Sequence, residues 1–356
     1  MKIDIQYKEN PQGKILDEEN MGFGDTFTDH MFTMDYVEGK GWHNARITPY
    51  APISLMPSAM GLHYGQTVFE GMKAYRRKDG KINLFRPLEN FKRLNRSNER
   101  ICIPKIDEEF LLKALTKLLQ IDGGWVPHVK YKSLYIRPFI FATDPQLGLR
   151  PAKEFKLMII MSPADTYYGR GLESIKIFVE NEYVRAVRGG MGEAKTGGNY
   201  AGSLKSQIDA MEENYAQVLW LDGVERKYIE EVGAMNIFFV LDEKIITPQL
   251  NGSILPGITR KSSIELLRDE GYTVEEKRIT MEEIAKAYDE NRLTEIFGTG
   301  TAAVISPIGQ LKWKDKVMKL GDMGGEVASL LYQKLTDLQW GDGKDEKNWI
   351  YTIPEE

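Results

Sequence analysis

The sequence is poor in the residues from which disulfides and metal sites are built. It has one cysteine, Cys102, and four histidines scattered over 356 residues. A single cysteine excludes an internal disulfide, and no Cys/His cluster has the spacing of a zinc site. Lysine and arginine total 47 against 52 acidic residues, which gives a net charge of −5. Because nucleic-acid-binding proteins show a basic excess, we expect no nucleic-acid partner.

Long apolar runs are also missing. No run approaches the ~20 residues that span a bilayer, and the longest, at 157–161 and 237–241, are short enough to be buried strands. The first residues, MKIDIQYKENPQGK, lack the apolar region of a secretory signal. We therefore expect a cytoplasmic protein that does not associate with membranes.

The composition is that of a globular enzyme with a large core, since 42% of the residues are hydrophobic and 28% are charged. At about 150 residues per domain, the length favours two domains. We predict a small N-terminal domain over 1–165, a turn-rich interdomain linker over 166–174 and a large C-terminal domain over 175–356. Strands and helices are mixed without regular alternation, which predicts an α+β fold.

Local signals are clearest in the first half. An Asp-Gly pair between two extended runs predicts a hairpin over 72–86. Pro87 is suited to the first turn of a helix, and Asp107 to the N-cap of a second. In the predicted strand 134–142, alternation places Tyr135 and Arg137 on one face.

The lone thiol has apolar neighbours. An isoleucine stands on each side of Cys102, in a segment that joins a predicted helix to a loop. Most cysteines in such surroundings are buried, so we expect an inert thiol.

Three glycine-rich stretches could contact phosphate. Residues 189–196 nearly match a P-loop, but Ala194 replaces a required glycine and Glu193 brings a negative charge. Residues 298–303 resemble a dinucleotide fingerprint, although no βαβ unit encloses them, so a tight turn or a single-phosphate site stays open. Residues 255–260 lead into a helix start, which offers free N–H groups to an anion.

A lysine and a carboxylate accompany these stretches. A lysine in a glycine-rich loop is ordinarily solvated, but Lys195 is followed along the chain by Glu230 and Glu231 and then by the two candidate single-phosphate sites. Lysine, carboxylate and phosphate-binding groups are the components of a pyridoxal 5′-phosphate (PLP) site.

Seven motifs in consistent order then resemble those of branched-chain amino acid aminotransferases. They cover about residues 20–350 and are Phe-Thr-Asp-His-Met at 27–31, His-Tyr-Gly-Gln-Thr-Val-Phe-Glu-Gly-Met-Lys-Ala at 63–74, Leu-Phe-Arg-Pro at 84–87, Lys-x-Gly-Gly-Asn-Tyr at 195–200, Glu-Val-Gly-x-Met-Asn-x-Phe at 231–238, Leu-Pro-Gly-Ile-Thr-Arg at 255–260 and Phe-Gly-x-Gly-Thr-Ala at 297–302.

The resemblance implies a two-domain PLP fold of type IV with the cofactor between the domains. It implies amino transfer between L-leucine, L-isoleucine or L-valine and 2-oxoglutarate, with glutamate and 2-oxo acids as the other small-molecule substrates, and a homodimer. D-amino acid aminotransferases and aminodeoxychorismate lyases would share Lys195 and Glu231, but the front-half motifs and the chain length argue against both. A nucleotide-binding protein that uses residues 189–196 is the alternative from another class.

The resemblance also implies roles for single residues. Lys195 would bind the cofactor covalently, Glu231 would face the pyridine nitrogen and Tyr200 the phenolic oxygen. The phosphate would be bound by Arg93, Ile258, Thr259 and Thr301. The α-carboxylate would be held by Tyr135, Arg137 and Ala302. The apolar pocket would be lined by Phe27, Tyr64, Phe69 and Tyr167, with Leu149 reaching the pocket of the neighbouring subunit.

Two adjacent acids compete for the pyridine nitrogen. Neighbours on an extended segment point to opposite faces, so only one of Glu230 and Glu231 can reach it. The spacing to the following Val-Gly selects Glu231, and we expect Glu230 to be solvated.

Overall fold

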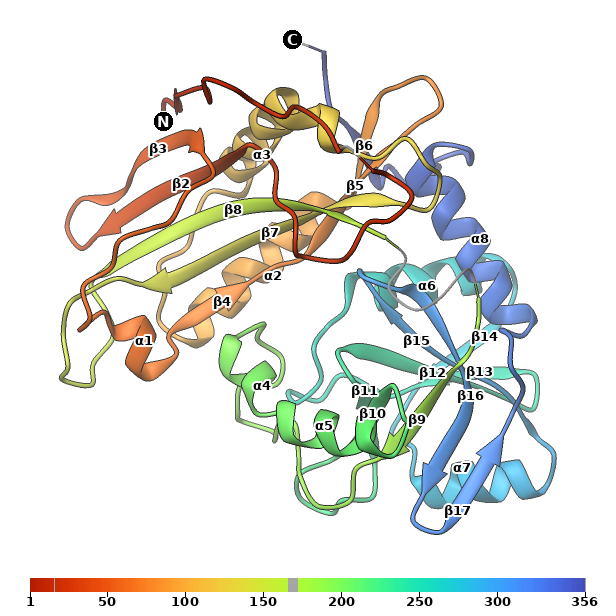
Figure 1. Cartoon of the computed structure of the whole chain (residues 1–356). Helices are drawn as coiled ribbons and strands as arrows, with labels where there is room; N and C mark the ends of the chain where they lie inside the picture. Colours follow the sequence, from red (N-terminus) through yellow and green to blue (C-terminus); the bar gives the residue numbers. More distant parts are fainter. Residues whose placement is uncertain (16, 166–171, 356) are drawn as a thin grey trace. The chain divides into compact units, whose positions relative to one another are not determined.

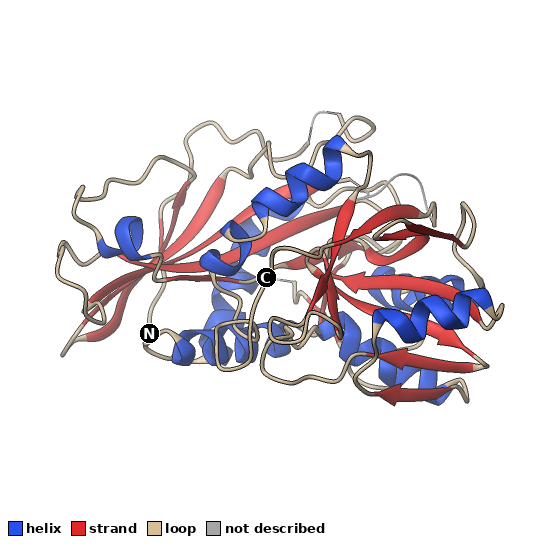
Figure 2. Ribbon diagram, turned by 90° about the horizontal axis from the view of Figure 1, so that it is seen from below, coloured by secondary structure: helices blue, strands red, loops and turns tan. Residues whose placement is uncertain are grey.

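The computed structural model describes residues 1–15, 17–165 and 172–355. This part of the chain contains eight α-helices, one short 3-10 helix and eighteen β-strands, and the strands form two nine-stranded sheets (Figures 1 and 2). The mixture agrees with the predicted α+β class.

Contacts divide the chain into two units. The first consists of Met1–Asp165, Ala194–Gly198 and Thr336–Glu356, and the second of the described residues in Thr166–Glu193 together with Asn199–Leu335. Two segments that the sequence prediction assigned to the C-terminal domain, 194–198 and 336–356, thus pack with the first unit. Most of the predicted linker lies outside the described residues.

The first unit is built on one largely antiparallel sheet. Its strands are β1 (Asp4–Ile5), β2 (His30–Val37), β3 (Gly41–Pro49), β4 (Thr67–Phe69), β5 (Met72–Arg76), β6 (Ile82–Phe85), β7 (Ser133–Ala142), β8 (Glu154–Ala164) and β18 (Ile350–Thr352). They follow the order β1-β3-β2-β8-β7-β5-β6-β18, with β4 also on β7. The long β7–β8 pair crosses the unit in Figure 1, and β5–β6 is the predicted hairpin.

Helices of the first unit are α1 (Met60–Tyr64), α2 (Pro87–Arg100), α3 (Glu108–Asp122) and the 3-10 turn Gly123–Trp125. Pro87 begins α2, and the carboxylate of Asp107 accepts the N–H groups of Glu109 and Phe110 at the start of α3, so both predicted helix starts are confirmed. The apolar faces of α2 and α3 pack on one face of the sheet. This core includes Phe32, Leu84, Phe91, Leu115, Ile136 and Leu157.

The second unit contains a closed barrel. Its strands are β9 (Ile175–Val179), β10 (Gln217–Leu221), β11 (Ile229–Val232), β12 (Met235–Leu241), β13 (Lys244–Thr247), β14 (Thr273–Glu276), β15 (Leu293–Gly300), β16 (Val304–Trp313) and β17 (Lys316–Lys319). In the order β11-β10-β9-β16-β15-β12, the last strand pairs with the first, so six strands form a ring. Strands β13, β14 and β17 extend it. The sequence pattern did not predict β11, β16 or the closure, which also requires the long-range pairings of β9 with β16 and of β12 with β15.

The remaining helices are α4 (Gly197–Ala201), α5 (Leu204–Glu212), α6 (Ile258–Asp269), α7 (Met281–Asp289) and α8 (Glu326–Trp340). A capping box between Thr280 and Glu283 begins α7, whereas no side chain caps the start of α6 at Gly257. Among the described residues, no helix is long and apolar enough to cross a membrane, and no group of His, Cys, Asp or Glu could hold a metal ion.

The prediction of a buried Cys102 is wrong. Cys102 is exposed and follows the end of α2 in the left-handed region, with φ of 59°. The turn carries the next residue, Ile103, into the core at 3% exposure. The flanking isoleucines therefore indicated that their own side chains pack against the core, and not that the thiol between them is buried.

A buried carboxylate fixes the N-terminal segment on the first sheet. Asp29 accepts hydrogen bonds from Lys8 Nζ, the N–H groups of Gln12 and Gly13, and Trp125 Nε1, over distances of 2.7 to 3.0 Å. Burial opposes the charge, but these donors outweigh it and hold the pKa of Asp29 well below its usual range. The carboxylate thus stabilises the folded segment at neutral pH.

We predict that Asp29→Asn frees this segment. An amide cannot accept all four donors, so hydrogen exchange at the amides of Gln12 and Gly13 should accelerate at least tenfold, equivalent to about 1.4 kcal/mol. Because the folded pKa is depressed, the difference from wild type should be constant above about pH 5 and shrink as the pH falls below about 4. Asp17→Asn, which removes an exposed turn carboxylate, is the control. Unchanged exchange in Asp29→Asn would contradict the anchoring role.

Candidate functional site

Lys195 lies in the short segment 194–198 that packs with the first unit. Its N–H donates to Ser97 Oγ of α2 at 2.9 Å, and its carbonyl accepts from the N–H of Phe69 at the end of β4 at 3.0 Å. Its Nζ lies 4.7 Å from the centre of the Phe69 ring. A helix and a strand therefore fix the backbone of Lys195.

Arg93 is buried on α2 and forms a bidentate ion pair with Glu70, whose side chain is fully buried. Its Nε lies 2.7 Å from Oε1 and its Nη2 lies 2.9 Å from Oε2, while Asn90 donates to Oε2 at 2.8 Å. Burial raises the pKa of Glu70, but the charges of Arg93 and Lys195 outweigh it and hold that pKa below its usual range. Glu70 is absent from the predicted site residues, although its motif at 63–74 was recognised.

Tyr135 and Arg137 lie on the same face of β7. Arg137 Nη2 donates to the Tyr135 hydroxyl at 3.1 Å, and the guanidinium carbon lies 4.7 Å from the centre of the Phe69 ring. The Nε of Arg137 is buried and has no hydrogen-bond partner among the described residues. A buried guanidinium N–H in this state is suited to an anionic ligand.

Lys73 adds a second cation to this face. It stands directly opposite Tyr135 in the β5–β7 ladder and is 6% exposed. Burial lowers the pKa of Lys73 to about 8. Alternation along β5 could have revealed it, because Met72 and Ala74 belong to the core and the residue between them must face the other side.

The other predicted pocket residues of the first unit lie in two places. Phe27 stacks on Tyr50, with 4.8 Å between ring centres and an interplanar angle of 9°. The Tyr64 hydroxyl donates to the carbonyl of Leu147 in the β7–β8 loop, where Leu149 is 80% exposed. Phe69 is thus the predicted pocket residue that the structure brings to Lys195 and Arg137. Tyr167 lies outside the described residues.

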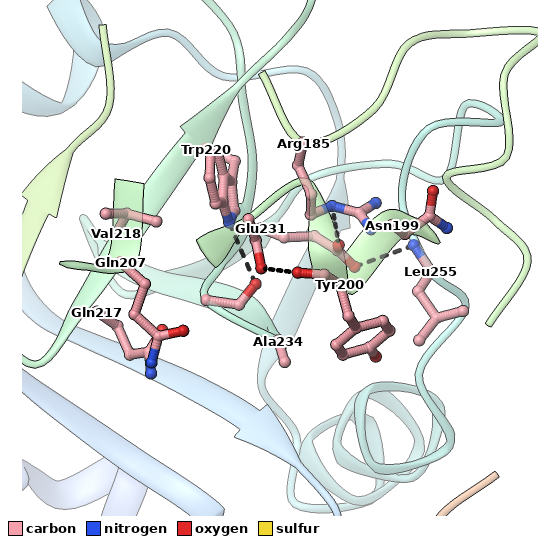
Figure 3. A pocket seen from close by; sticks show the side chains of 12 residues that line it. Arg185, Asn199, Tyr200, Gln207, Gln217, Val218, Trp220, Glu231, Ala234 and Leu255 are labelled. Atoms are coloured by element: carbon pink, nitrogen blue, oxygen red, sulfur yellow. Dashed lines mark hydrogen bonds and ion pairs between the residues drawn. The ribbon is translucent and has the colours of Figure 1, made fainter. Parts of the chain in front are cut away.

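In the second unit, Glu231 projects from β11 and is 3% exposed. Its Oε2 lies 2.7 Å from Arg185 Nε, and its Oε1 accepts from Leu255 N at 2.9 Å and from Asn236 Nδ2 at 3.1 Å. The side chain of Arg185 is buried together with that of Glu231, and no sequence motif had pointed to Arg185 as a site residue. Figure 3 shows Glu231, Arg185 and Tyr200 around a cavity of about 180 Å³. The arrangement is a buried, charge-balanced carboxylate beside a phenol.

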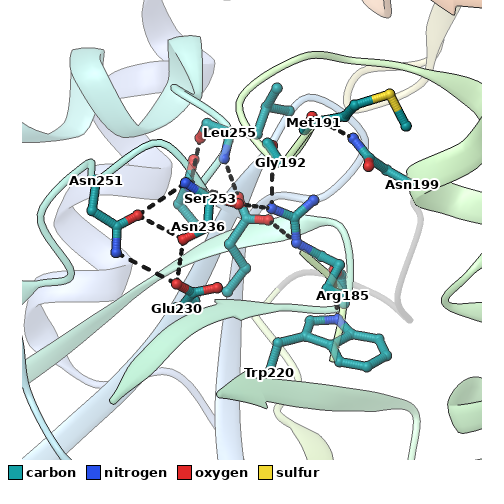
Figure 4. Close-up of polar contacts among 12 residues, drawn as sticks. Arg185, Met191, Gly192, Asn199, Trp220, Glu230, Asn236, Asn251, Ser253 and Leu255 are labelled. Carbon is teal, nitrogen blue, oxygen red and sulfur yellow. Dashed lines mark hydrogen bonds and ion pairs between the residues drawn. The ribbon is translucent and has the colours of Figure 1, made fainter. Parts of the chain in front are cut away.

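The expectation that Glu230 is solvated is wrong. Glu230 is also 3% exposed, and all four residues of β11 are buried. Asn251 and Ser253 contact Glu230, whereas Arg185 and Leu255 contact Glu231, so side chains on both faces of β11 are covered by other parts of the chain. Glu230 lies within hydrogen-bond reach of Ser253 Oγ and, at 3.4 Å, accepts from Asn251 Nδ2 (Figure 4).

The predicted phosphate contacts of the second unit lie at two chain turns. Ile258 and Thr259 form the first turn of α6, which lacks a side-chain cap, so their N–H groups face no capping oxygen. A Cβ on Gly257 would lie 2.0 Å from Asn236 Oδ1, so only glycine permits this close approach. Thr301 and Ala302 follow β15 directly and are half-buried.

The near-P-loop does not form a nucleotide cradle. Residues 188–193 form turns, and the helix that follows Lys195, α4, has only five residues. A P-loop requires a helix that starts immediately after its lysine and continues. Residues 189–196 therefore do not have the structure of a P-loop, and the nucleotide-binding alternative is not supported.

Comparison with known proteins now decides between the remaining classes. The model of the class IV aminotransferase family matches residues 67–311. The branched-chain-amino-acid transaminase 1 of Bacillus subtilis is 53% identical over 98% of this chain and 97% of its own length. The chain belongs to the class IV aminotransferases, as a branched-chain amino acid aminotransferase.

Other relatives and solved structures agree. A probable branched-chain-amino-acid aminotransferase of Staphylococcus epidermidis is 52% identical over 99% of both chains. The crystal structure of the Escherichia coli branched-chain amino acid aminotransferase superposes with a TM-score of 0.78 at 27% identity, covering 92% of this chain and 99% of that one. The type IV fold predicted for this aminotransferase is thereby confirmed.

We predict that Glu70→Gln destabilises the first unit strongly. The neutral amide leaves Arg93 buried without its counter-charge, which typically costs about 3–5 kcal/mol of unfolding free energy. Urea unfolding at pH 7 measures the loss. Glu89→Gln on α2, the helix that carries Arg93, breaks a surface pair with Lys92 and should cost under about 1 kcal/mol. Equal losses in the two variants would mean that burial of the Glu70–Arg93 pair does not matter.

Proposed function

We propose that this chain moves the amino group between L-leucine, L-isoleucine or L-valine and 2-oxoglutarate, with Lys195 as the residue that binds PLP and transfers the proton. Amino transfer on branched-chain substrates with PLP is the activity of the family. The observation that carries the proposal for this chain is 53% identity to a transaminase over 98% of the chain, together with a Lys195 whose backbone is fixed on both sides.

The donor set fits PLP in each unit taken by itself. The first unit offers an amine on Lys195 and a buried guanidinium on Arg93. The second offers the anionic Glu231 for a protonated ring nitrogen, the phenol of Tyr200 and the uncapped start of α6 for phosphate. When bound, PLP supplies an electron sink that stabilises negative charge at the α-carbon of the substrate. The protonated ring nitrogen would thus meet an anion, the phosphate a cation and N–H groups, and the phenolic oxygen a neutral hydroxyl donor.

Lys195 Nζ is the group that we assign to proton transfer. The backbone contacts to Ser97 and Phe69 support this role, because they hold the Cα of Lys195 in place from both sides. The Phe69 ring at 4.7 Å excludes water from one side of the amine. Nζ would accept the proton from the α-carbon of the amino-acid substrate. It would return a proton to the α-carbon of the 2-oxo acid when the reaction runs in the reverse sense.

Glu231 is the residue that we assign to the ring nitrogen. A carboxylate there favours the protonated, positively charged form of the ring. The ion pair with Arg185 and the N–H of Leu255 keep Glu231 ionised in its buried position and fix its orientation. Tyr200 lines the same cavity and is assigned to the phenolic oxygen.

Arg137, Tyr135 and Lys73 are assigned to the substrate carboxylates. The buried Nε–H of Arg137, which has no partner among the residues that the structure describes, supports this because it can donate to a carboxylate oxygen. A second cation on the same face suits an enzyme that alternates between a monocarboxylate with an apolar side chain and the dicarboxylate glutamate. Bound ligands of related structures belong to these two kinds, since one branched-chain amino acid aminotransferase is complexed with 4-methylvaleric acid and also, in a separate crystal structure, with N-(5′-phosphopyridoxyl)-L-glutamate.

An amino-donor panel with 2-oxoglutarate tests the proposal. Leucine, isoleucine and valine should all be donors, with kcat/KM values within roughly 100-fold, because an apolar pocket discriminates one methylene by only about 1–3 kcal/mol. Lys195→Ala should abolish turnover and covalent labelling by borohydride, whereas Lys113→Ala on the exposed side of α3 should do neither. A preference for alanine or for D-amino acids, or a label on another lysine, would refute it.

We also infer that the chain acts as a homodimer. Four apolar side chains, each more than 60% exposed, gather at α1 and the β7–β8 loop: Met56, Leu62, Leu147 and Leu149. The two elements are joined by the hydrogen bond from Tyr64 to Leu147 and by the Ala59–Pro145 bridge. Apolar groups gathered on a fixed surface indicate an interface, and a second copy is the occupant that the family resemblance favours.

A charge in this surface should weaken the dimer. Leu149→Asp is expected to lower the sedimentation coefficient from that of a dimer to that of a single chain at micromolar concentration, because the carboxylate must be desolvated on association. Val224→Asp is the matched control, since Val224 is 79% exposed and lies in the second unit. A wild-type chain that sediments as a monomer would refute the interface, as would a Leu149→Asp dimer of unchanged affinity.

A further inference from the structure

The segment 251–255 connects the ring-nitrogen carboxylate to the phosphate end of the proposed site. It runs toward α6, and Gly252 turns it with φ of 96°, a conformation that favours glycine. Its last residue, Leu255, donates its N–H to Glu231 at 2.9 Å. Its Ser253 carbonyl accepts from Arg185 Nη2, the ion-pair partner of Glu231. Any displacement of this segment therefore moves two groups that orient Glu231.

Glu230 holds the other side of the same segment (Figure 4). Its Oε1 accepts from Asn251 Nδ2 at 3.4 Å and lies within hydrogen-bond reach of Ser253 Oγ. Ser253 Oγ also lies 2.7 Å from Asn251 Oδ1, which accepts the N–H of Ser253 at 3.0 Å. Glu230 and Ser253 are 3% and 0% exposed, so no bulk water supplements these contacts.

Counting protons in this cluster shows a mismatch. The Ser253 hydroxyl has one proton but faces two acceptor oxygens, on Glu230 and Asn251. The N–H of Ser253 fixes which end of the Asn251 amide is the oxygen, so flipping that amide does not help. The second oxygen of Glu230 is buried and has no partner among the described residues. If Glu230 were ionised, one of the two contacts of Ser253 Oγ, with Glu230 or with Asn251, would therefore have no proton between its oxygen atoms.

We propose that Glu230 is a neutral carboxylic acid that donates a hydrogen bond to Ser253 Oγ and thereby positions Glu231 and the start of α6. With its proton on Glu230, the chain of donors is complete: Glu230 donates to Ser253, and Ser253 donates to Asn251. The negative charge of this part of the barrel then resides on Glu231 alone, where Arg185 balances it. Glu230 is a positioning residue, and the proposal rests on the assignment of Glu231 made above.

The test compares Glu230→Gln with Glu230→Ala in the holoenzyme. Glutamine keeps the size, the neutral charge and a donor, so it should preserve kcat and the pH midpoint of the cofactor absorption band. Alanine removes the donor and should shift that midpoint and lower kcat by about 10- to 100-fold, the loss typical when a group that orients a ligand is removed, with little change in the KM for leucine. The infrared difference between wild type and Glu230→Gln should contain a protonated-carboxyl band at pH 7.

Each contrary result overturns the proposal. Glu230→Gln as impaired as Glu230→Ala would show that a charge is needed, and an absent carboxyl band would show that Glu230 is ionised. If Glu230→Ala does not fold, Ser253→Ala removes the acceptor instead and should give the same spectral shift; a normal spectrum there counts against the proposal. Glu231→Gln, measured alongside, should lower turnover by several orders of magnitude. If it does not, the assignment of Glu231 fails, whereas an impaired Glu231→Gln beside a normal Glu230→Ala defeats only the role of Glu230.

Discussion

The two hydrogen bonds on either side of the Lys195 backbone are the constraint on which the proposed chemistry depends. The lysine stands in a five-residue segment that packs with the first unit, although the chain on both sides of that segment belongs to the second. Ser97 and Phe69 hold the segment, and Phe69 also lies against Arg137. One short segment therefore sets the amine in fixed relation to the guanidinium that we assign to the substrate carboxylate.

Much of the fold could be predicted from local sequence signals. The Asp-Gly hairpin, the proline at the start of α2 and the cap at Asp107 each depend on residues that are close in the chain, and each was found where it was expected. The order of seven motifs identified the family and the fold type together. The roles of Lys195, Glu231 and the other site residues come from the resemblance and stay proposals.

The features that could not be predicted from the sequence depend on contacts between segments that are far apart in the chain. Glu230 is buried because the segment 251–255, about twenty residues further along the chain, lies against it through Asn251 and Ser253. Alternation separates the faces of a strand but cannot tell that both faces are covered. Arg185 and Glu70 were missed for the same reason, since each becomes significant only through a partner far along the chain. Cys102 shows the converse, because its own left-handed backbone leaves its thiol exposed while the next residue, Ile103, is buried.

Closure of the barrel also bears on how the chain behaves in concentrated solution. Ring closure satisfies the backbone hydrogen-bonding groups of β11, the strand that carries Glu231. Strands β14 and β17 lie at the open edges of the sheet, where the backbone of another chain could pair. Glu275 and Glu276 end β14, and lysines stand at both ends of β17. A strand added at either border would have to desolvate these charges, so the second unit is protected against the edge-to-edge association from which fibrous aggregates grow.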